Sequence, residues 1–373
     1  MEFEIDQARF LSALSLAQTV ADKRSTMPVL ANVLLRASGE DSVVCSATDM
    51  MISLTETIPA EVKNSGSLTV GVRHLHGVVK TLPSGDLGFK GLENHWAQIT
   101  ARKSEFKLMG MPEGDFPELP DPKTSGKGKK PVEFATITGH ILSDLINKTE
   151  FSVSTDEARV NLNGVLLESD GTTATMVSTD GHRLTKYSRP MEGLTLDKGI
   201  IIPRKGMVEI RRVLDRIPGE VEVGVGDQHL FLRAGALLLS VKLNNVKFPP
   251  YQQVIPAGHK REVTVGRAEL VGALRRAEVM APEKTATVRL RLSEGTLELT
   301  ADNPDLGVAH QELSVELEGE PLEAGFNARY LMHALEVMDG EDVKLQFQKE
   351  LDPCVIKPAD ETDFLGVVMP MRI

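Results

Sequence analysis

Cysteine and long apolar runs are scarce in this sequence of 373 residues. Only Cys45 and Cys354 are present, and their separation fits neither a disulfide framework nor a metal-ligand spacing. We therefore interpret both as small buried hydrophobic residues. No apolar stretch approaches the roughly 20 residues that a membrane span needs. Residues 1–10, MEFEIDQARF, lack the basic and apolar regions of a signal peptide. These absences predict a cytoplasmic protein.

Motifs of catalysis and nucleotide binding are missing too. The sequence contains no Walker motif, nucleophile elbow, HExxH motif or dinucleotide fingerprint. His74 and His76 lie in a helical pattern at a spacing that does not place them on one face, which argues against a metal pair. We therefore expect a protein that is not an enzyme and that holds neither a metal nor a cofactor.

A net positive charge, the usual mark of a nucleic-acid binder, is also absent. The chain carries 42 basic and 53 acidic residues, a net charge of −11. Six stretches with helical patterns nevertheless sum to +6, so the remainder carries −17. The stretches are residues 6–24, 72–82, 139–149, 203–217, 266–278 and 327–339. If these helices share one surface, that surface attracts DNA while the acidic remainder repels it. The alternative is ordinary scatter of charge over solvated helix faces.

The chain shows a threefold internal repeat, which must be found before any motif is interpreted. Each third opens with a short strand pattern and a helix pattern, as in residues 3–20, 132–149 and 261–279. Two alternating strands follow, and then a second helix, a Gly turn and another strand. The aspartates predicted to close the alternating strands are Asp49, Asp180 and Asp302.

Composition changes mark the boundaries between the repeats. Residues 121–131, DPKTSGKGKKP, and residues 255–262, IPAGHKRE, have the composition of linkers. We expect an α+β fold of three repeated domains, each with two helices packed on antiparallel sheets. The predicted domains are residues 1–125, 130–256 and 261–373.

The size of these domains suits a ring. A domain of about 125 residues has a radius of gyration of about 14 Å and spans roughly 35 Å. Six such bodies in a hexagon leave a hole of comparable width, which exceeds the roughly 20 Å of B-DNA. A head-to-tail dimer of the chain supplies six bodies, provided that its rotation closes.

Asp180 and His182 are the one pair that invites a catalytic interpretation, as acid and base. The structural alternative is a turn in which Asp180 caps backbone amides and Gly181 takes a positive φ. The counterparts Asp49 and Asp302 keep the acid but lack the histidine. We therefore favour a turn, with His182 available for contact with a peptide.

Several segments, in order along the whole chain, resemble the beta sliding clamp of bacterial DNA polymerase III. They are residues 24–35 (RSTMPVLANVLL), 111–120 (MPEGDFPELP), 178–184 (STDGHRL), 247–256 (KFPPYQQVIP), 325–330 (GFNARY) and 367–373 (VVMPMRI). The resemblance implies three domains per chain and a six-domain ring formed by a head-to-tail homodimer. It further implies helices around the hole and continuous sheets outside, with no catalytic activity.

The resemblance also implies a cleft between the second and third domains that binds short peptide motifs of partners. The implied partners are the alpha subunit of DNA polymerase III, the clamp loader, other DNA polymerases, mismatch-repair proteins and ligase. The matching positions are Leu162, Thr179, Gly181, His182, Arg183, Leu184, Pro249, Gln253, Val254, Asn327, Tyr330, Leu351, Pro353, Val367, Val368, Met369, Pro370, Met371, Arg372 and Ile373. The family often has Arg in place of Gln253.

Two further sets of residues follow from the resemblance. Sequence-independent contact with the phosphates of duplex DNA is implied for Arg24, Arg73, Lys80, Arg159, Arg204 and Lys205. Val160 and Asn161 stand where well-known clamps have aromatic residues, so base stacking is not expected there. The implied dimer interface contains Phe106, Val279 and Met280. A repeat-built adaptor that binds peptides but never DNA is the competing interpretation.

Overall fold

The computed structural model describes residues 1–360 and 363–372, and its contacts divide the chain into two compact units. Unit 1 contains residues 1–140 and 205–243, and unit 2 contains residues 141–204 and 244–373. The division cuts through the middle repeat, whose strands are shared between the sheets of the two units. Our three domain boundaries therefore remain a prediction drawn from the repeat and the linkers.

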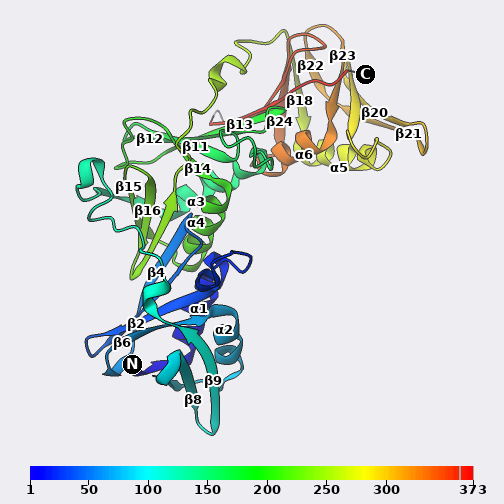
Figure 1. The fold of residues 1–373 in the computed structure, drawn as a ribbon. Coiled ribbons are helices and arrows are strands. Elements are labelled where there is room, and N and C mark those ends of the chain that lie inside the picture. Colours follow the sequence, from blue (N-terminus) through cyan, green and yellow to red (C-terminus); the bar gives the residue numbers. More distant parts are fainter. Residues whose placement is uncertain (361–362, 373) are drawn as a thin grey trace. The chain divides into compact units, whose positions relative to one another are not determined.

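Unit 1 is built on one long antiparallel sheet (Figure 1). Its strands in sheet order are β10 (Phe134–Thr138), β15 (Glu220–Val225), β16 (His229–Ala234), β17 (Leu237–Lys242), β4 (Ile52–Pro59), β3 (Ser42–Thr48), β2 (Asn32–Ser38), β6 (Gly66–Gly71), β9 (Ser104–Met111), β8 (Trp96–Ala101), β7 (Asp86–Gly91), β1 (Glu2–Asp6) and β5 (Glu61–Asn64). Buried and exposed residues alternate along strands such as β8, as expected for a sheet with one solvated face.

Helices α1 (Gln7–Val20) and α2 (Val72–Thr81) pack together on this unit, and most of α4 (Arg204–Arg216) belongs to it (Figure 1). Helix α1 begins where the carboxylate of Asp6 accepts a hydrogen bond from the amide of Arg9 at 2.9 Å. Phe10 and Leu14 are fully buried, as the helical spacing predicted. The helix ends at Val20, so the prediction that it continues to Arg24 was wrong.

The core of unit 1 contains a cluster of phenylalanines under α1. Phe3 is fully buried, stacks on Phe89 at 4.9 Å between ring centroids and meets the edge of Phe10 at 6.4 Å. We expect Phe3→Ala to lower the free energy of unfolding by about 3–5 kcal/mol, because it removes buried apolar surface and leaves a cavity. Urea unfolding followed by circular dichroism measures the change. Trp96→Ala is the control, since Trp96 is 40% exposed and should cost under about 1 kcal/mol. Equal losses for the two variants would contradict the assignment of this core.

Unit 2 contains two antiparallel sheets. The larger has the order β14 (Ile200–Pro203), β11 (Gly164–Ser169), β12 (Thr173–Thr179), β13 (Arg183–Pro190), β26 (Phe364–Val368), β25 (Cys354–Pro358), β24 (Asp342–Phe347), β18 (Arg261–Gly266) and β22 (Glu316–Glu318). The smaller has the order β21 (Gly307–Ser314), β20 (Thr296–Asn303), β19 (Thr287–Ser293) and β23 (Leu322–Asn327). Strands β13 and β26 join the second and third repeats into one sheet, which brings the chain's final strand beside the Asp180 turn.

Helices α5 (Arg267–Glu278) and α6 (Ala328–Glu336) pack together in unit 2, while α3 (Gly139–Asn147) begins in unit 1 and continues into unit 2 (Figure 1). Leu270, Leu274 and Ala277 on α5 are buried, as predicted. The short 3₁₀ helices are η1 (Pro28–Ala31), η2 (Glu93–His95), η3 (Glu113–Asp115), η4 (Lys127–Lys129), η5 (Glu150–Ser152) and η6 (Tyr251–Gln253). Throughout the described ranges, no helix has the length and apolarity to span a membrane.

The predicted aspartate turns exist in two of the three repeats. Strand β3 ends before Asp49, and β12 ends before Asp180. Asp302 instead lies inside β20, where it pairs with Val308, so the prediction that it closes its strand was wrong. The ladder between β20 and β21 continues to Asn303, and this longer hairpin replaces the turn. Cys45 and Cys354 are both buried, as predicted.

Candidate functional site

The turn between β12 and β13 is held together by its own polar groups. Asp180 Oδ1 accepts hydrogen bonds from the amides of His182 at 2.9 Å and Arg183 at 3.1 Å. Gly181 takes a φ of +91°, a left-handed conformation that favours glycine. The hydroxyl of Thr179 donates to the carbonyl of Arg183 at 2.6 Å. The predicted capping turn is therefore confirmed, and the Asp180 carboxylate is occupied by backbone amides.

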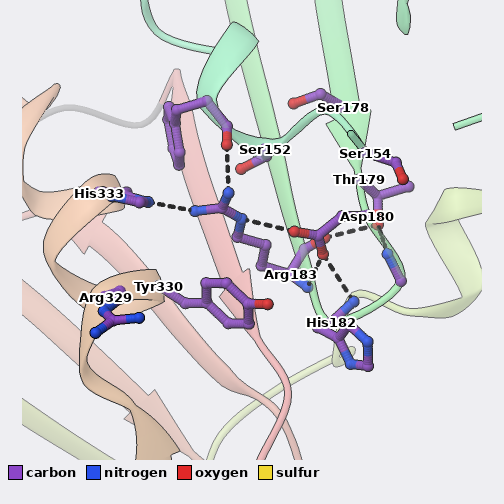
Figure 2. A network of polar contacts seen from close by, with 12 residues as sticks. Ser152, Ser154, Ser178, Thr179, Asp180, His182, Arg183, Arg329, Tyr330 and His333 are labelled. Carbon is purple, nitrogen blue, oxygen red and sulfur yellow. Dashed lines mark hydrogen bonds and ion pairs between the residues drawn. The ribbon is translucent and has the colours of Figure 1, made fainter. Parts of the chain in front are cut away.

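The side chain of Arg183 is enclosed by protein groups (Figure 2). It is only 10% exposed and forms an ion pair with Asp180 at 2.9 Å. Its other nitrogens donate to the carbonyl of Phe151 and, at 2.7 Å, to His333 Nδ1. Its guanidinium also lies over the Tyr330 ring, 4.6 Å from the centroid. Arg183 therefore links the turn to helix α6, while the neighbouring His182 is left exposed.

Helix α6 presents Tyr330 toward this turn because of how the helix starts. Asn327 caps it, accepting hydrogen bonds from the amides of Arg329 at 2.9 Å and Tyr330 at 3.2 Å. The rings of Tyr330 and His182 are nearly parallel, with centroids 6.4 Å apart. Figure 2 shows Arg183, Tyr330 and His182 at the same junction. Two predicted residues from different repeats thus form one aromatic wall.

The final strand and the residues after it lie against this wall. Strand β26 pairs with β13, and the amide of Met369 donates to the carbonyl of His182 at 2.9 Å. The amide of Met371 donates to the carbonyl of Gly325 at 2.7 Å. These backbone bonds fix the tail while the Met369 side chain stays 36% exposed. Pro370 and Met371 are half-buried and Arg372 is exposed, whereas Ile373 lies outside the described residues.

An apolar cluster in unit 2 includes two of the predicted cleft residues. Its buried members are Leu166, Val177, Leu184, Ile201, Phe248, Tyr251, Val355 and Val367. Leu184 and Val367 belong to the predicted set, but both are almost fully buried, and so is Val368. Burial and then a hydrogen bond to Glu168 raise the pKa of Tyr251 to about 12, so its phenol stays neutral. Leu184 and Val367 therefore belong to the core of unit 2 and are not surface groups.

The remaining predicted cleft residues differ widely in exposure. Leu162 is buried, Pro249 and Pro353 are half-buried, and Gln253 is exposed. The most exposed apolar members are Val254 at 42% and Leu351 at 64%. A pocket of about 260 Å³ lies beside them. Its lining is Ile255, Pro256, Ala257, Gly258, His259, Gln346, Gln348, Pro353, Val355, Lys357 and Leu365. Pro353 is the predicted residue that reaches it.

Comparison with known families matches the chain in three consecutive segments. Sequence models of the DNA polymerase III beta subunit match its N-terminal domain at residues 1–120, its central domain at 136–250 and its C-terminal domain at 252–372. The chain belongs to the DNA polymerase III beta subunit family. The resemblance seen in the sequence is thereby confirmed over its full length.

Individual members of the beta subunit family agree with this assignment. The chain is similar to the beta sliding clamp of Pseudomonas aeruginosa, with 35% identity over all of both chains. It is 30% identical to the beta sliding clamp of Escherichia coli, again over all of both chains. A Pseudomonas aeruginosa sliding clamp bound to griselimycin superimposes over all of both chains with a TM-score of 0.92 and 34% identity.

The basic residues expected to face DNA in this beta-subunit fold are all exposed. Arg73 and Lys80 lie on α2, Arg204 begins α4, and Arg24 lies in the loop after α1. These four make no ion pair with any residue in the part of the chain that the structure describes. Their charges therefore remain available to a phosphate.

Arg159 and Lys205 differ from the other four because both pair with acids. Lys205 is ion-paired with Asp49, and Arg159 lies 3.4 Å from Asp156. Arg159 also donates to the carbonyl of Asp180 at 3.4 Å. The charges of Arg159 and Lys205 are therefore partly neutralised within the chain.

The residues expected at the subunit interface are apolar and partly exposed. Phe106 on β9 is 36% exposed, Val279 at the end of α5 is 72% exposed, and Met280 is half-buried. Leu306, in the turn before β21, and Val308, on β21, are also more than 60% exposed and were not predicted.

Proposed function

We propose that two copies of this chain join head to tail into a ring that encloses duplex DNA and tethers DNA polymerases to it. Membership of the beta subunit family over the full length is the observation that carries this proposal. The chain would act without catalysis, as a DNA polymerase processivity factor in the cytoplasm. Its hold on DNA would come from enclosure, because the exposed basic residues suit weak phosphate contact without recognition of sequence.

Unpaired strand edges support the head-to-tail contact. Strand β9 pairs with β8 along its length, but with β6 only at Met111 and Gly110. In the described part of unit 2, β21 pairs with β20 alone. A free antiparallel edge is a ready template for a strand of another chain. Phe106 lies on the first edge and Val308 on the second, so pairing of these edges would bury apolar side chains on both sides.

The cleft around His182, Tyr330 and the tail would bind short peptides of the partner proteins. Flexible methionines and an aromatic wall suit several different sequences, since methionine adapts its shape to the ligand. The proposed partners are the alpha subunit of DNA polymerase III, the clamp loader, other DNA polymerases, mismatch-repair proteins and ligase. The griselimycin-bound Pseudomonas aeruginosa clamp supplies a peptide-like probe for this cleft.

Retention on circular DNA tests the enclosure. The labelled protein is loaded onto nicked plasmid by the clamp loader with ATP, and bound protein is measured by gel filtration. We expect most of it to travel with the closed circle and to leave after a restriction enzyme cuts the circle, because a ring slides off a free end. An adaptor that binds only peptides would remain on neither form. Equal retention on circular and linear DNA would contradict enclosure.

A further inference from the structure

Helix α6 contributes His333 to the group formed by Arg183, Tyr330 and His182. The resemblance did not assign a role to His333. Its Nδ1 lies 2.7 Å from a guanidinium nitrogen of Arg183, although the two residues are 150 positions apart in the sequence. A guanidinium only donates hydrogen bonds, so Nδ1 must accept. Figure 2 shows His333 beside the Arg183 guanidinium. An imidazole that accepts at Nδ1 is neutral and carries its proton on Nε2.

We propose that neutral His333 is a positioning residue for peptide binding, because it holds Arg183 against Tyr330 beside the exposed ring of His182. The inference rests on the proposed function of the cleft. His333 need not touch the peptide. It acts through Arg183, whose guanidinium packs on the Tyr330 ring and whose backbone belongs to the same turn as His182.

The enclosure of Arg183 makes the His333 acceptor important. The Arg183 side chain is only 10% exposed. If the guanidinium lost its acceptor, water could not easily reach it to accept the hydrogen bond instead. The ion pair with Asp180 and the bond to the carbonyl of Phe151 would persist and keep the turn folded. The expected result is a shifted guanidinium and a less ordered Tyr330 in an otherwise folded protein.

Charged groups on three elements face His333. Arg183 on β13 and Arg329 on α6 disfavour its protonation, whereas Glu336 on α6 and Glu278 on α5 favour it. Partial burial, followed by the charge of Arg183, lowers the pKa of His333 below its usual 6.5. Asp180 belongs to the same network, where it neutralises Arg183. The glutamates are themselves paired, Glu278 with Arg329 and Glu336 with Arg275.

The sign of the pH effect follows from the lowered pKa. At neutral pH the imidazole is uncharged and accepts from Arg183. As the pH falls below about 6.5 and through the lowered pKa, protonation removes the acceptor and places a second positive charge beside Arg183. Peptide binding should therefore weaken on acidification.

Binding of fluorescein-labelled griselimycin, measured by fluorescence polarisation between pH 8 and pH 5, tests the inference. His333→Leu removes the acceptor, whereas His333→Asn keeps an acceptor that does not titrate in this range. At pH 8 we expect His333→Leu to bind roughly tenfold more weakly than the unaltered protein, the effect of one hydrogen bond to a charged group. His333→Asn should bind more tightly than His333→Leu. On acidification the unaltered protein should lose affinity more steeply than His333→Asn.

The comparison between variants removes the pH effects of other groups and of the probe, because these are common to every variant. The matched control is the asparagine substitution at His140, an exposed histidine on α3. The His140→Asn variant should show the same pH profile of griselimycin binding as the unaltered protein. Parallel profiles for the unaltered protein and His333→Asn would overturn the inference. Absence of griselimycin binding by the unaltered protein at pH 8 would instead refute the cleft itself, so the two failures are distinguishable. Circular dichroism at each pH confirms that every variant is folded.

Discussion

Replacing His182, Pro370 and Met371 together with alanine is expected to abolish stimulation of the polymerase while the ring still forms. All three residues belong to the proposed cleft, where His182 is exposed and Pro370 and Met371 are half-buried. The tail is held to the sheet by backbone amides of Met369 and Met371, which alanine retains. Truncating three contact residues at about 1–2 kcal/mol each should weaken peptide binding by about three orders of magnitude.

Two measurements check this prediction. Primer extension on a primed circular template should give only the short products of unassisted polymerase, and labelled griselimycin should no longer bind at micromolar concentration. The matched control replaces Met27, Met50 and Met51 with alanine, since these are exposed side chains that lie in unit 1, away from the proposed cleft. It should stimulate like the unaltered protein. Undiminished stimulation by the cleft variant would remove the cleft assignment.

Local chemistry explains why much of the fold was predictable from the sequence. Helix α2 was expected at residues 72–82 and spans Val72–Thr81, because three buried residues recur at helical spacing along it. The Asp180 turn was predictable for a similar reason. Its aspartate, glycine and strand ends are consecutive, and an aspartate bonds to amides only two and three residues ahead.

Features that depend on distant segments were not predictable. Arg183 was placed in the cleft by resemblance, but its acceptor His333 comes from a helix in another repeat. Asp302 was assigned a turn by analogy with Asp49 and Asp180, yet the length of a ladder depends on both of its strands. The internal repeat likewise indicates which segments are equivalent along the chain. It does not indicate which strands pair, and the sheets continue from one repeat into the next.

Changing Val279 and Met280 together to aspartate is expected to convert the dimer into monomers. Val279 is 72% exposed in the single chain, so a charge there costs the isolated subunit little. In a closed ring of two subunits the substitution occurs at both interfaces, and each new carboxylate would be buried without a partner. A penalty of about 4 kcal/mol in total corresponds to a thousandfold weaker association.

Sedimentation velocity at micromolar concentration distinguishes the two states. Met50→Asp is the control, because Met50 is 53% exposed and its φ of 73° lies in a region that aspartate tolerates better than most residues. That variant should sediment as a dimer. A dimer for the double variant as well would place the interface elsewhere. A monomer that still binds griselimycin would show that each subunit carries a complete cleft, as expected when all the described cleft residues belong to unit 2.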